Sequence, residues 1–230
     1  MPAWKQEFKS GALAIAPLAA AAVPFGMILG AQALQKGLTP AEIMLMSLTV
    51  FAGGAQFMAV GLWQYPVPWA GIAFAVFLVN LRHVLMSASL VGSMGLFRPW
   101  QRWLAVFVMA DETWATAERR AAVQPLTVAY YAGIGVALYA TWAVSTALGT
   151  LLGGLIHNPE KLGFDFAFPA VFICVVMGFA RSWRAAPVIL VSAATALLVR
   201  HLAGGTWYVI AGGLAGMAVA AALPAPGRGR

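Results

Sequence analysis

Residues 49–57 read TVFAGGAQF and place two adjacent glycines and an amide inside a run that is otherwise apolar enough to cross a membrane. Glycine weakens a helix in water because its flexible backbone loses more entropy on folding. In a membrane bundle, small residues let helices approach closely, and neighbouring groups can satisfy backbone that leaves the helix. The stretch therefore indicates either a close helix contact or a break in a membrane helix.

The sequence on both sides has the composition of a membrane protein. Hydrophobic residues make up 62% of the 230 residues and charged residues 9%, against roughly 25% charged in soluble domains. Several apolar runs reach the roughly 20 residues that a transmembrane helix needs. The runs cover residues 11–34, 41–63, 67–97, 103–117, 126–156, 166–180, 186–203 and 205–222. We expect an all-α polytopic membrane protein, a single integral membrane domain over residues 1–230 with about seven to eight transmembrane helices.

Some of these runs have the wrong length or content for a straight membrane helix. Polar residues interrupt the run 67–97, and the runs 103–117 and 166–180 are short for about 30 Å of hydrocarbon. The first run contains Pro17, Pro24, Gly26 and Gly30, which allow either packing or a break. We therefore expect some helices to be broken or re-entrant.

Basic residues between the runs predict the orientation, because loops rich in lysine and arginine face the cytoplasm. Eight crossings place both termini and most basic groups inside: Lys5, Lys9, Arg119, Arg120, Arg181, Arg184, Arg228 and Arg230. Arg98 and Arg102 fit only if the run 67–97 dips into the membrane and returns on the same side. We expect a bacterial cytoplasmic membrane protein with both termini cytoplasmic.

Several function classes find no support in the sequence. The net charge of +7 does not indicate nucleic acid binding, because the basic residues separate apolar runs instead of forming a stripe. Cys174 is the only cysteine, and the three histidines are far apart. No metal, nucleotide or serine-nucleophile motif occurs. We expect no cofactor, no metal and no enzymatic activity, since an enzyme using Asp111 or His83 would need a second poised group.

Asn80, Arg82 and His83 lie within an apolar run, where polar side chains are costly and commonly functional. On a helix, Asn80, His83 and Ser87 share one face. The guanidinium of Arg82 suits a substrate carboxylate because it offers paired donors, and His83 could relay a proton. The alternative is that residues 67–80 and 84–97 are two shorter elements, with Arg82 and His83 at an aqueous turn.

Asp111 and Glu112 are adjacent acids within WLAVFVMADETWATA, residues 103–117. Neighbours on a helix point about 100° apart, so one carboxyl group can face the bundle interior and take up and release protons. The alternative is a helix end at the membrane interface, with one of these acids paired to Arg119 or Arg120.

For Gly53, Gly54 and Gln56 we expect a contact with substrate. On a continuous helix Thr49, Gly53 and Gln56 would share one polar and small face. If the helix breaks there, freed backbone groups and the Gln56 amide could meet the charged ends of a substrate, while Phe51, Phe57 and Met58 supply apolar surface. The alternative is that the glycines admit a neighbouring helix and that Gln56 hydrogen-bonds across it.

The remaining polar residues favour ordinary roles. Arg200 and His201 are expected at a membrane interface before a glycine turn and Trp207, and the tryptophans are expected to act as interface anchors. His157, Glu160 and Asp165 lie in a polar connection that we expect to face water.

Three blocks of this sequence resemble the AzlC family of branched-chain amino acid permeases. They are PFGMILGAQALQKGLTPAEIMLMSLTVFAGGAQFMAVGLW at 24–63, VNLRHVLMSASL at 79–90 and ADETWA at 110–115. Their order and spacing also agree, whereas DFAFPAVFICVVMGFA at 165–180 is a weaker match. Gly54 stands where the family commonly carries a small hydroxyl residue.

The resemblance implies export of branched-chain amino acids together with a small AzlD-type membrane subunit. Polar breaks in membrane helices independently favour a carrier that works by alternating access. With no nucleotide site, uphill export suggests proton antiport, with Asp111 as the preferred proton carrier, His83 second and Glu112 beside them. The alternatives are facilitated diffusion, a carrier for another small neutral metabolite, or a membrane scaffold whose glycine stripes, including Gly212 and Gly213, bind partner helices.

Overall fold

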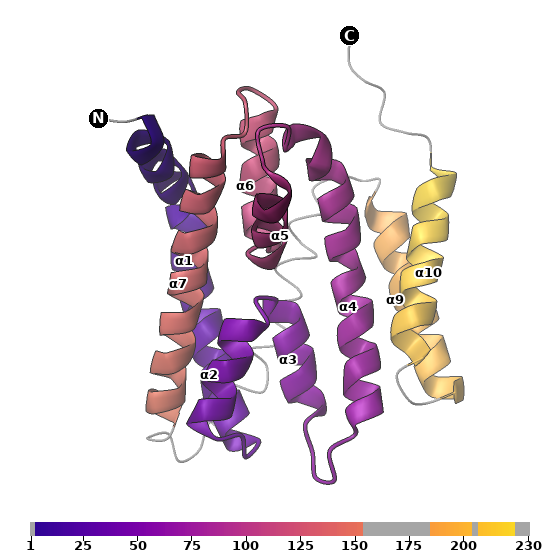
Figure 1. Cartoon of the computed structure of the whole chain (residues 1–230). Helices are drawn as coiled ribbons and strands as arrows, with labels where there is room; N and C mark the ends of the chain where they lie inside the picture. Colours follow the sequence, from indigo (N-terminus) through magenta and orange to yellow (C-terminus); the bar gives the residue numbers. More distant parts are fainter. Residues whose placement is uncertain (1–2, 154–184, 204–206, 224–230) are drawn as a thin grey trace. The chain divides into compact units, whose positions relative to one another are not determined.

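The computed structural model describes residues 3–153, 185–203 and 207–223, and these are folded into helices with short connections (Figure 1). The predicted all-α architecture is therefore confirmed. Among the described residues, four helical segments are long and apolar enough to cross a membrane: Trp4–Gln35, Trp69–Ser93, Val128–Gly153 and Ala185–Leu202. The chain divides into two compact units, Met1–Asp165 and Phe166–Arg230, and each is described by itself. A single transporter domain stays a prediction.

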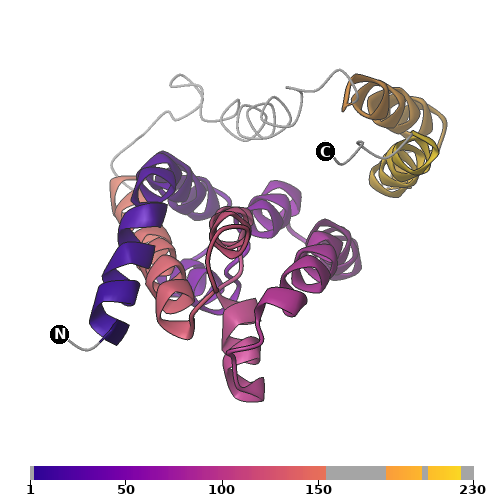
Figure 2. The ribbon, with the colours of Figure 1, turned by 90° about the horizontal axis from the view of Figure 1, so that it is seen from above.

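Two long helices form the scaffold of the first unit. Helix α1 (Ala3–Gln35) packs along α7 (Val128–Gly153), and Figure 2 shows them side by side. A Cβ atom added at Gly30 would lie 2.7 Å from the Thr150 backbone nitrogen, and one at Gly149 would overlap the Met27 carbonyl. Glycine is needed at both positions because the two backbones touch.

The prolines of the first run do not break it. Helix α1 continues through Pro17 and Pro24, and a Cβ at Gly26 would meet Ser145 of α7. Backbone groups that a proline frees inside a membrane helix can be satisfied by neighbours. For this run, close packing is the correct interpretation.

The second run does break, and it breaks at TVFAGGAQF. Helix α2 (Pro40–Thr49) ends before the tripeptide 50–52, and α3 (Gly53–Leu62) begins directly after it. Thr39 caps α2 through a reciprocal pair of hydrogen bonds with Glu42. Each helix has 10 residues, which at 1.5 Å per residue is about 15 Å or half a membrane.

The third run is one helix, α4 (Trp69–Leu90), followed by a short 3-10 turn, η1 (Val91–Ser93). It passes without interruption through Asn80, Arg82 and His83. The alternative of an aqueous turn at Arg82 and His83 is therefore wrong, and the three polar residues belong to the middle of a helix long enough to span a membrane.

The fourth run is a second pair of short helices. Helix α5 (Pro99–Phe107) and α6 (Asp111–Ala121) are separated by residues 108–110, and Asp111 and Glu112 form the first turn of α6. Asp111 contacts Arg82, and Glu118 accepts a hydrogen bond from Ser89. Arg82 and Ser89 are seven residues apart on α4, and their partners Asp111 and Glu118 are seven residues apart on α6. Helix α6 therefore runs beside α4 in the same direction.

The helix pairs α2–α3 and α5–α6 each enter the first unit at one end, turn at the break and return to that end. The two pairs enter from opposite ends (Figure 1). The connection before α2 lies near the one after α3, since a Cβ at Gly37 would lie 3.7 Å from the Tyr65 ring. The pair α5 and α6 enters and leaves at the other end, beside the end of α4. Re-entrant segments are therefore confirmed, but they are residues 40–62 and 99–121 instead of 67–97.

This topology explains the arginines that did not fit a count of crossings. Since α5 and α6 return to the end where they start, Arg98 and Arg102 lie at the same end as Arg119 and Arg120 (Figure 1). The N-terminal part of α1 joins them, because Glu7 pairs with Arg120 at 2.9 Å.

The second unit contains helices α9 (Ala185–Ala203) and α10 (Trp207–Ala222) in its described part. A Cβ at Gly212 would lie 3.0 Å from the Ala196 Cβ, and Gly216 also faces α9. Arg200 and His201 are exposed in the last turn of α9, and their place at a membrane interface stays a prediction. Several predicted features lie outside the described residues: the run 166–180, His157, Glu160, Asp165, Cys174, Arg181, Arg184, Arg228 and Arg230.

Candidate functional site

The two helix breaks meet at one tyrosine of the scaffold. The ring of Tyr139, near the middle of α7, lies 5.2 Å from the Phe51 ring and 6.1 Å from the Phe107 ring, centroid to centroid. Its hydroxyl donates a 2.6 Å hydrogen bond to the Leu48 carbonyl at the end of α2. The breaks of the two re-entrant pairs, at residues 50–52 and 108–110, therefore lie at the same depth of the first unit.

Arg82 connects the same two pairs from the opposite helix, α4. Its Nη1 donates to Asp111 Oδ2 at 2.6 Å, at the start of α6. Its Nη2 lies 3.0 Å from where a Cβ of Gly54 would be, at the start of α3. The side chains of Arg82 and Asp111 are 34% and 45% exposed, so a polar solute could reach the pair.

The glycines do not themselves bend the chain. The break is made by non-helical backbone at Val50 (φ −119°) and Ala52 (φ −147°), whereas Gly53 and Gly54 are already helical. Because Thr49 belongs to α2, it shares no helix face with Gly53, and that prediction is wrong. A Cβ at Gly53 would lie 2.9 Å from Trp142 Cη2, so both glycines permit close approach: Gly53 to Trp142 and Gly54 to Arg82.

Gln56 is buried against the scaffold helix, with 1% of its surface exposed. Its Oε1 accepts a 2.9 Å hydrogen bond from Trp142 Nε1, which matches the expected bond to a neighbouring helix. Its Nε2 is also buried and has no partner among the described residues. The amide can therefore brace α3 against α7 and still donate to a ligand.

Three further polar atoms on α4 are buried without a hydrogen-bond partner among the described residues. They are Asn80 Oδ1, Arg82 Nε and His83 Nδ1. Most buried polar atoms in proteins have a partner, so each exception indicates a place for water or a ligand, and Asn80 and His83 share a face of α4 that Arg82 does not. Ser87, on the face of Asn80 and His83, contacts Met109 Sδ at 3.8 Å.

The two half-helix N-termini have opposite electrostatic character. The first turn of α6 carries Asp111 and Glu112, which more than offset the partial positive charge of a helix N-terminus. The first turn of α3 carries no acidic residue, and no side chain caps it. Chemically, the α3 end suits an anion and the α6 end suits a cation.

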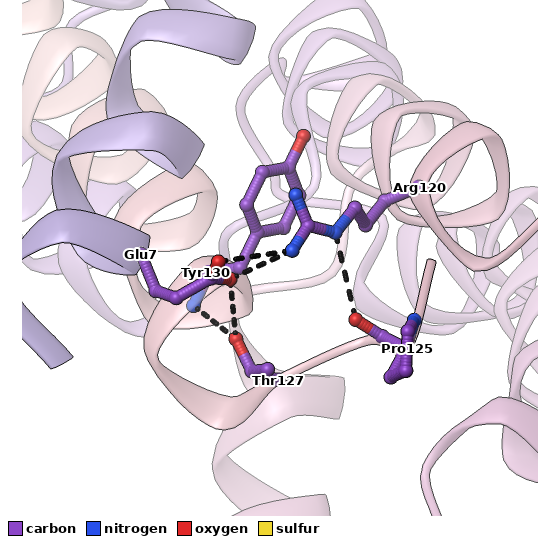
Figure 3. Close-up of polar contacts among 5 residues, drawn as sticks. All are labelled: Glu7, Arg120, Pro125, Thr127 and Tyr130. Atoms are coloured by element: carbon purple, nitrogen blue, oxygen red, sulfur yellow. Dashed lines mark hydrogen bonds and ion pairs between the residues drawn. The ribbon is translucent and has the colours of Figure 1, made fainter. Parts of the chain in front are cut away.

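A separate ion pair holds the scaffold to the base of α6 (Figure 3). Arg120 Nη2 donates to both Glu7 carboxylate oxygens, at 3.0 and 2.9 Å, and Thr127 also donates to Glu7 at 2.9 Å. The Arg120 guanidinium lies 4.6 Å from the Tyr130 ring centroid. The alternative paired Asp111 or Glu112 with Arg119 or Arg120; Asp111 pairs with Arg82 instead, and Arg120 pairs with Glu7.

Tyr139 and Trp142 are the residues of this site that sequence reasoning missed. The tryptophans were expected at membrane interfaces, and Trp69, Trp100 and Trp103 are indeed exposed. Trp142 is instead buried. The available signal was position, because interface anchors lie near the ends of a membrane helix, whereas Tyr139 and Trp142 lie in the middle of one.

Membrane-length helices, together with half-length helices that enter the first unit from opposite ends and meet beside Arg82 and Tyr139, define a polytopic helical membrane protein with a polar site at its helix breaks. Within the described residues, no group of three or more histidine, cysteine or acidic side chains could hold a metal. The chain belongs to the AzlC family: the family profile described as AzlC protein matches residues 17–156, which include both re-entrant pairs and Arg82.

Known relatives of this chain are also membrane proteins. It is 28% identical to an uncharacterized membrane protein of Archaeoglobus fulgidus, over 74% of each chain. It is 24% identical to the inner membrane protein YgaZ of Escherichia coli, over 88% of this chain and 83% of the relative. No solved structure matches it.

Proposed function

We propose that this protein is a secondary transporter that exports branched-chain amino acids across the cytoplasmic membrane by proton antiport, together with a small AzlD-type subunit. One observation carries the transporter class: two re-entrant pairs approach from opposite ends and meet at Arg82 and Tyr139. Many secondary transporters bind substrate at such discontinuous helices and expose it alternately to the two sides.

The site supports a zwitterionic substrate. A carboxylate fits beside Arg82 and the α3 N-terminus, and an ammonium group fits beside the acidic first turn of α6. Phe51 and Phe57 are apolar and lie next to the break, where both side chains are buried. The branched-chain preference and the AzlD-type partner rest on the family resemblance.

Asp111 offers a physical basis for proton coupling. When ionised, it fixes the Arg82 guanidinium through the 2.6 Å contact and so prepares it for a substrate carboxylate. When protonated, it loses most of its attraction for Arg82 and releases it. Proton and substrate would then oppose each other's binding, which is what antiport requires.

Counterflow measurements test the transporter class most directly. Purified protein is reconstituted into liposomes loaded with unlabelled leucine, isoleucine or valine, with and without a co-expressed AzlD-type subunit. We expect labelled amino acid to enter loaded vesicles faster than empty ones, and fastest with the subunit. Absence of flux for every amino acid tested, in both preparations, would favour a membrane scaffold; equal flux without the subunit would remove it as a requirement.

The orientation has its own test. In a Cys174→Ala background, single cysteines replace Tyr65, Leu96 and Gln124, and intact or inverted vesicles are treated with an impermeant maleimide. Leu96→Cys and Gln124→Cys should react from the cytoplasmic side, because their end of the unit carries the arginines. Tyr65→Cys, at a site that is 73% exposed, should react from the opposite side. Labelling of all three from one side would show that α4 does not cross.

A further inference from the structure

Arg82 uses only part of its hydrogen-bonding capacity within the protein. Arginine carries five N–H donors on a planar fork, and two donors along one edge match the two oxygens of a carboxylate. Asp111 occupies Nη1. The other donors are Nε, which is buried and has no partner among the described residues, and Nη2, which lies beside Gly54. Because Nη2 is the terminal nitrogen on the Nε side of the guanidinium, these two form one edge.

That edge lies next to the N-terminus of α3. The first intrahelical hydrogen bond of α3 runs from Gln56 N to Ala52 O, so the amides of Gly53, Gly54 and Ala55 precede it. Such amides carry partial positive charge and attract anions. Gln56, two residues further along and 1% exposed, faces α7, where its Oε1 accepts a hydrogen bond from Trp142 Nε1. Two kinds of N–H donor therefore lie beside each other: the Nε–Nη2 edge of Arg82 and the first-turn amides of α3.

We propose that the Nε–Nη2 edge of Arg82 and the first turn of α3 form a binding site for the α-carboxylate of the transported amino acid. Gly54 is the residue that leaves room beside Nη2, and Asp111 is a positioning residue that holds the guanidinium through Nη1. The carboxylate accepts two hydrogen bonds from Arg82 and further ones from the α3 amides. This inference rests on the proposed function only in naming an amino acid as the ligand.

The requirement for glycine at position 54 is steric and local. An added Cβ would lie 3.0 Å from Nη2, 3.7 Å from Cζ of Arg82 and 3.7 Å from Val79 Cγ1. The methyl group would therefore crowd Nη2 and push the guanidinium away by a few tenths of an ångström. Alanine is also the better helix former, so lost binding would not reflect a weakened α3.

The test compares Gly54→Ala with Gly61→Ala, a matched control in the same helix where an added Cβ meets nothing within 4 Å. Binding of three probes to the purified protein is measured by calorimetry: leucine, 4-methylpentanoate, which keeps the carboxylate but lacks the ammonium group, and leucinamide, which lacks the carboxylate. We expect Gly54→Ala to weaken binding of leucine and 4-methylpentanoate about tenfold or more, and Gly61→Ala to change neither. Leucinamide should not compete with leucine.

The outcomes separate this site from the proposed function. If wild-type protein transports leucine but leucinamide competes as well as leucine, or Gly54→Ala binds like Gly61→Ala, the transporter stands and the carboxylate site falls. If no amino acid is transported, yet 4-methylpentanoate binds and loses affinity only in Gly54→Ala, the site stands and the transporter falls. Arg82→Lys, which keeps the charge but removes the fork, should lose binding as Gly54→Ala does.

Discussion

Replacing Asp111 with asparagine is expected to abolish proton-driven uphill transport while leaving part of the exchange activity. Asparagine keeps the size of the side chain, but it can neither ionise nor balance the charge of Arg82. The coupling by which a bound proton opposes substrate binding is therefore lost. The measurement is leucine accumulation in proteoliposomes with an acidic interior, where an antiporter drives the amino acid inward as protons leave. Wild-type protein should accumulate leucine, and Asp111→Asn should only equilibrate it.

Glu118→Gln is the matched control, because it removes a carboxylate from the same helix at the far end of α6. Glu118 accepts a hydrogen bond from Ser89 and has no contact with Arg82 among those seen in the structure. We expect it to retain uphill transport. If Asp111→Asn keeps an unchanged pH dependence, Asp111 is not the proton carrier, and the same experiment on Glu112→Gln and His83→Gln identifies the group that is.

Replacing Gly30 with leucine is expected to prevent accumulation of folded protein. The side chain would start 2.7 Å from the Thr150 backbone nitrogen, and a Cβ there would also overlap the Thr146 carbonyl of α7. Backbone cannot yield as a side chain can, so the two scaffold helices must separate. Overpacking a core typically costs about 1–3 kcal/mol, and we expect more than about 3 kcal/mol at this contact. Size-exclusion chromatography of detergent extracts measures the loss.

Gly61→Leu provides the comparison for this prediction. It makes the same exchange at a helical position where a Cβ has open space, and we expect it to elute as folded protein. A monodisperse Gly30→Leu protein with wild-type thermal stability would show that the close contact between α1 and α7 is not required. Both variants keep Arg82 and the breaks unchanged, so the result concerns the scaffold alone.

The helix breaks show what a single sequence can and cannot reveal. The predicted break of the second apolar run lies directly before Gly53 and Gly54, at residues 50–52, whereas both glycines are helical and permit close approach of Trp142 and Arg82. The sequence did not distinguish this run from the one with Pro17 and Pro24, which α1 accommodates without a break. Whether a weak point becomes a break depends on the neighbouring helix, and α7 supports α1 along its length.

The sequence likewise identified residues of the candidate site but not the partners that they contact. Because polar groups are costly within apolar runs, the sequence alone identified Arg82, Asp111 and Gln56 as candidates. It offered a pairing of Asp111 or Glu112 with Arg119 or Arg120 as an alternative, since these residues are close together in sequence. The observed partner, Arg82, is 29 residues away on α4.

Composition and spacing by themselves determined that this chain is helical, lies in a membrane and carries polar residues within its apolar runs, since these properties follow from residue type and period along the chain. The tertiary structure alone decided that two runs turn back instead of crossing, that Arg82 bridges both breaks, and that Tyr139 and Trp142 belong to the site. The physical reason is that these contacts join residues far apart in sequence, and their formation depends on how whole helices pack, which no local pattern encodes.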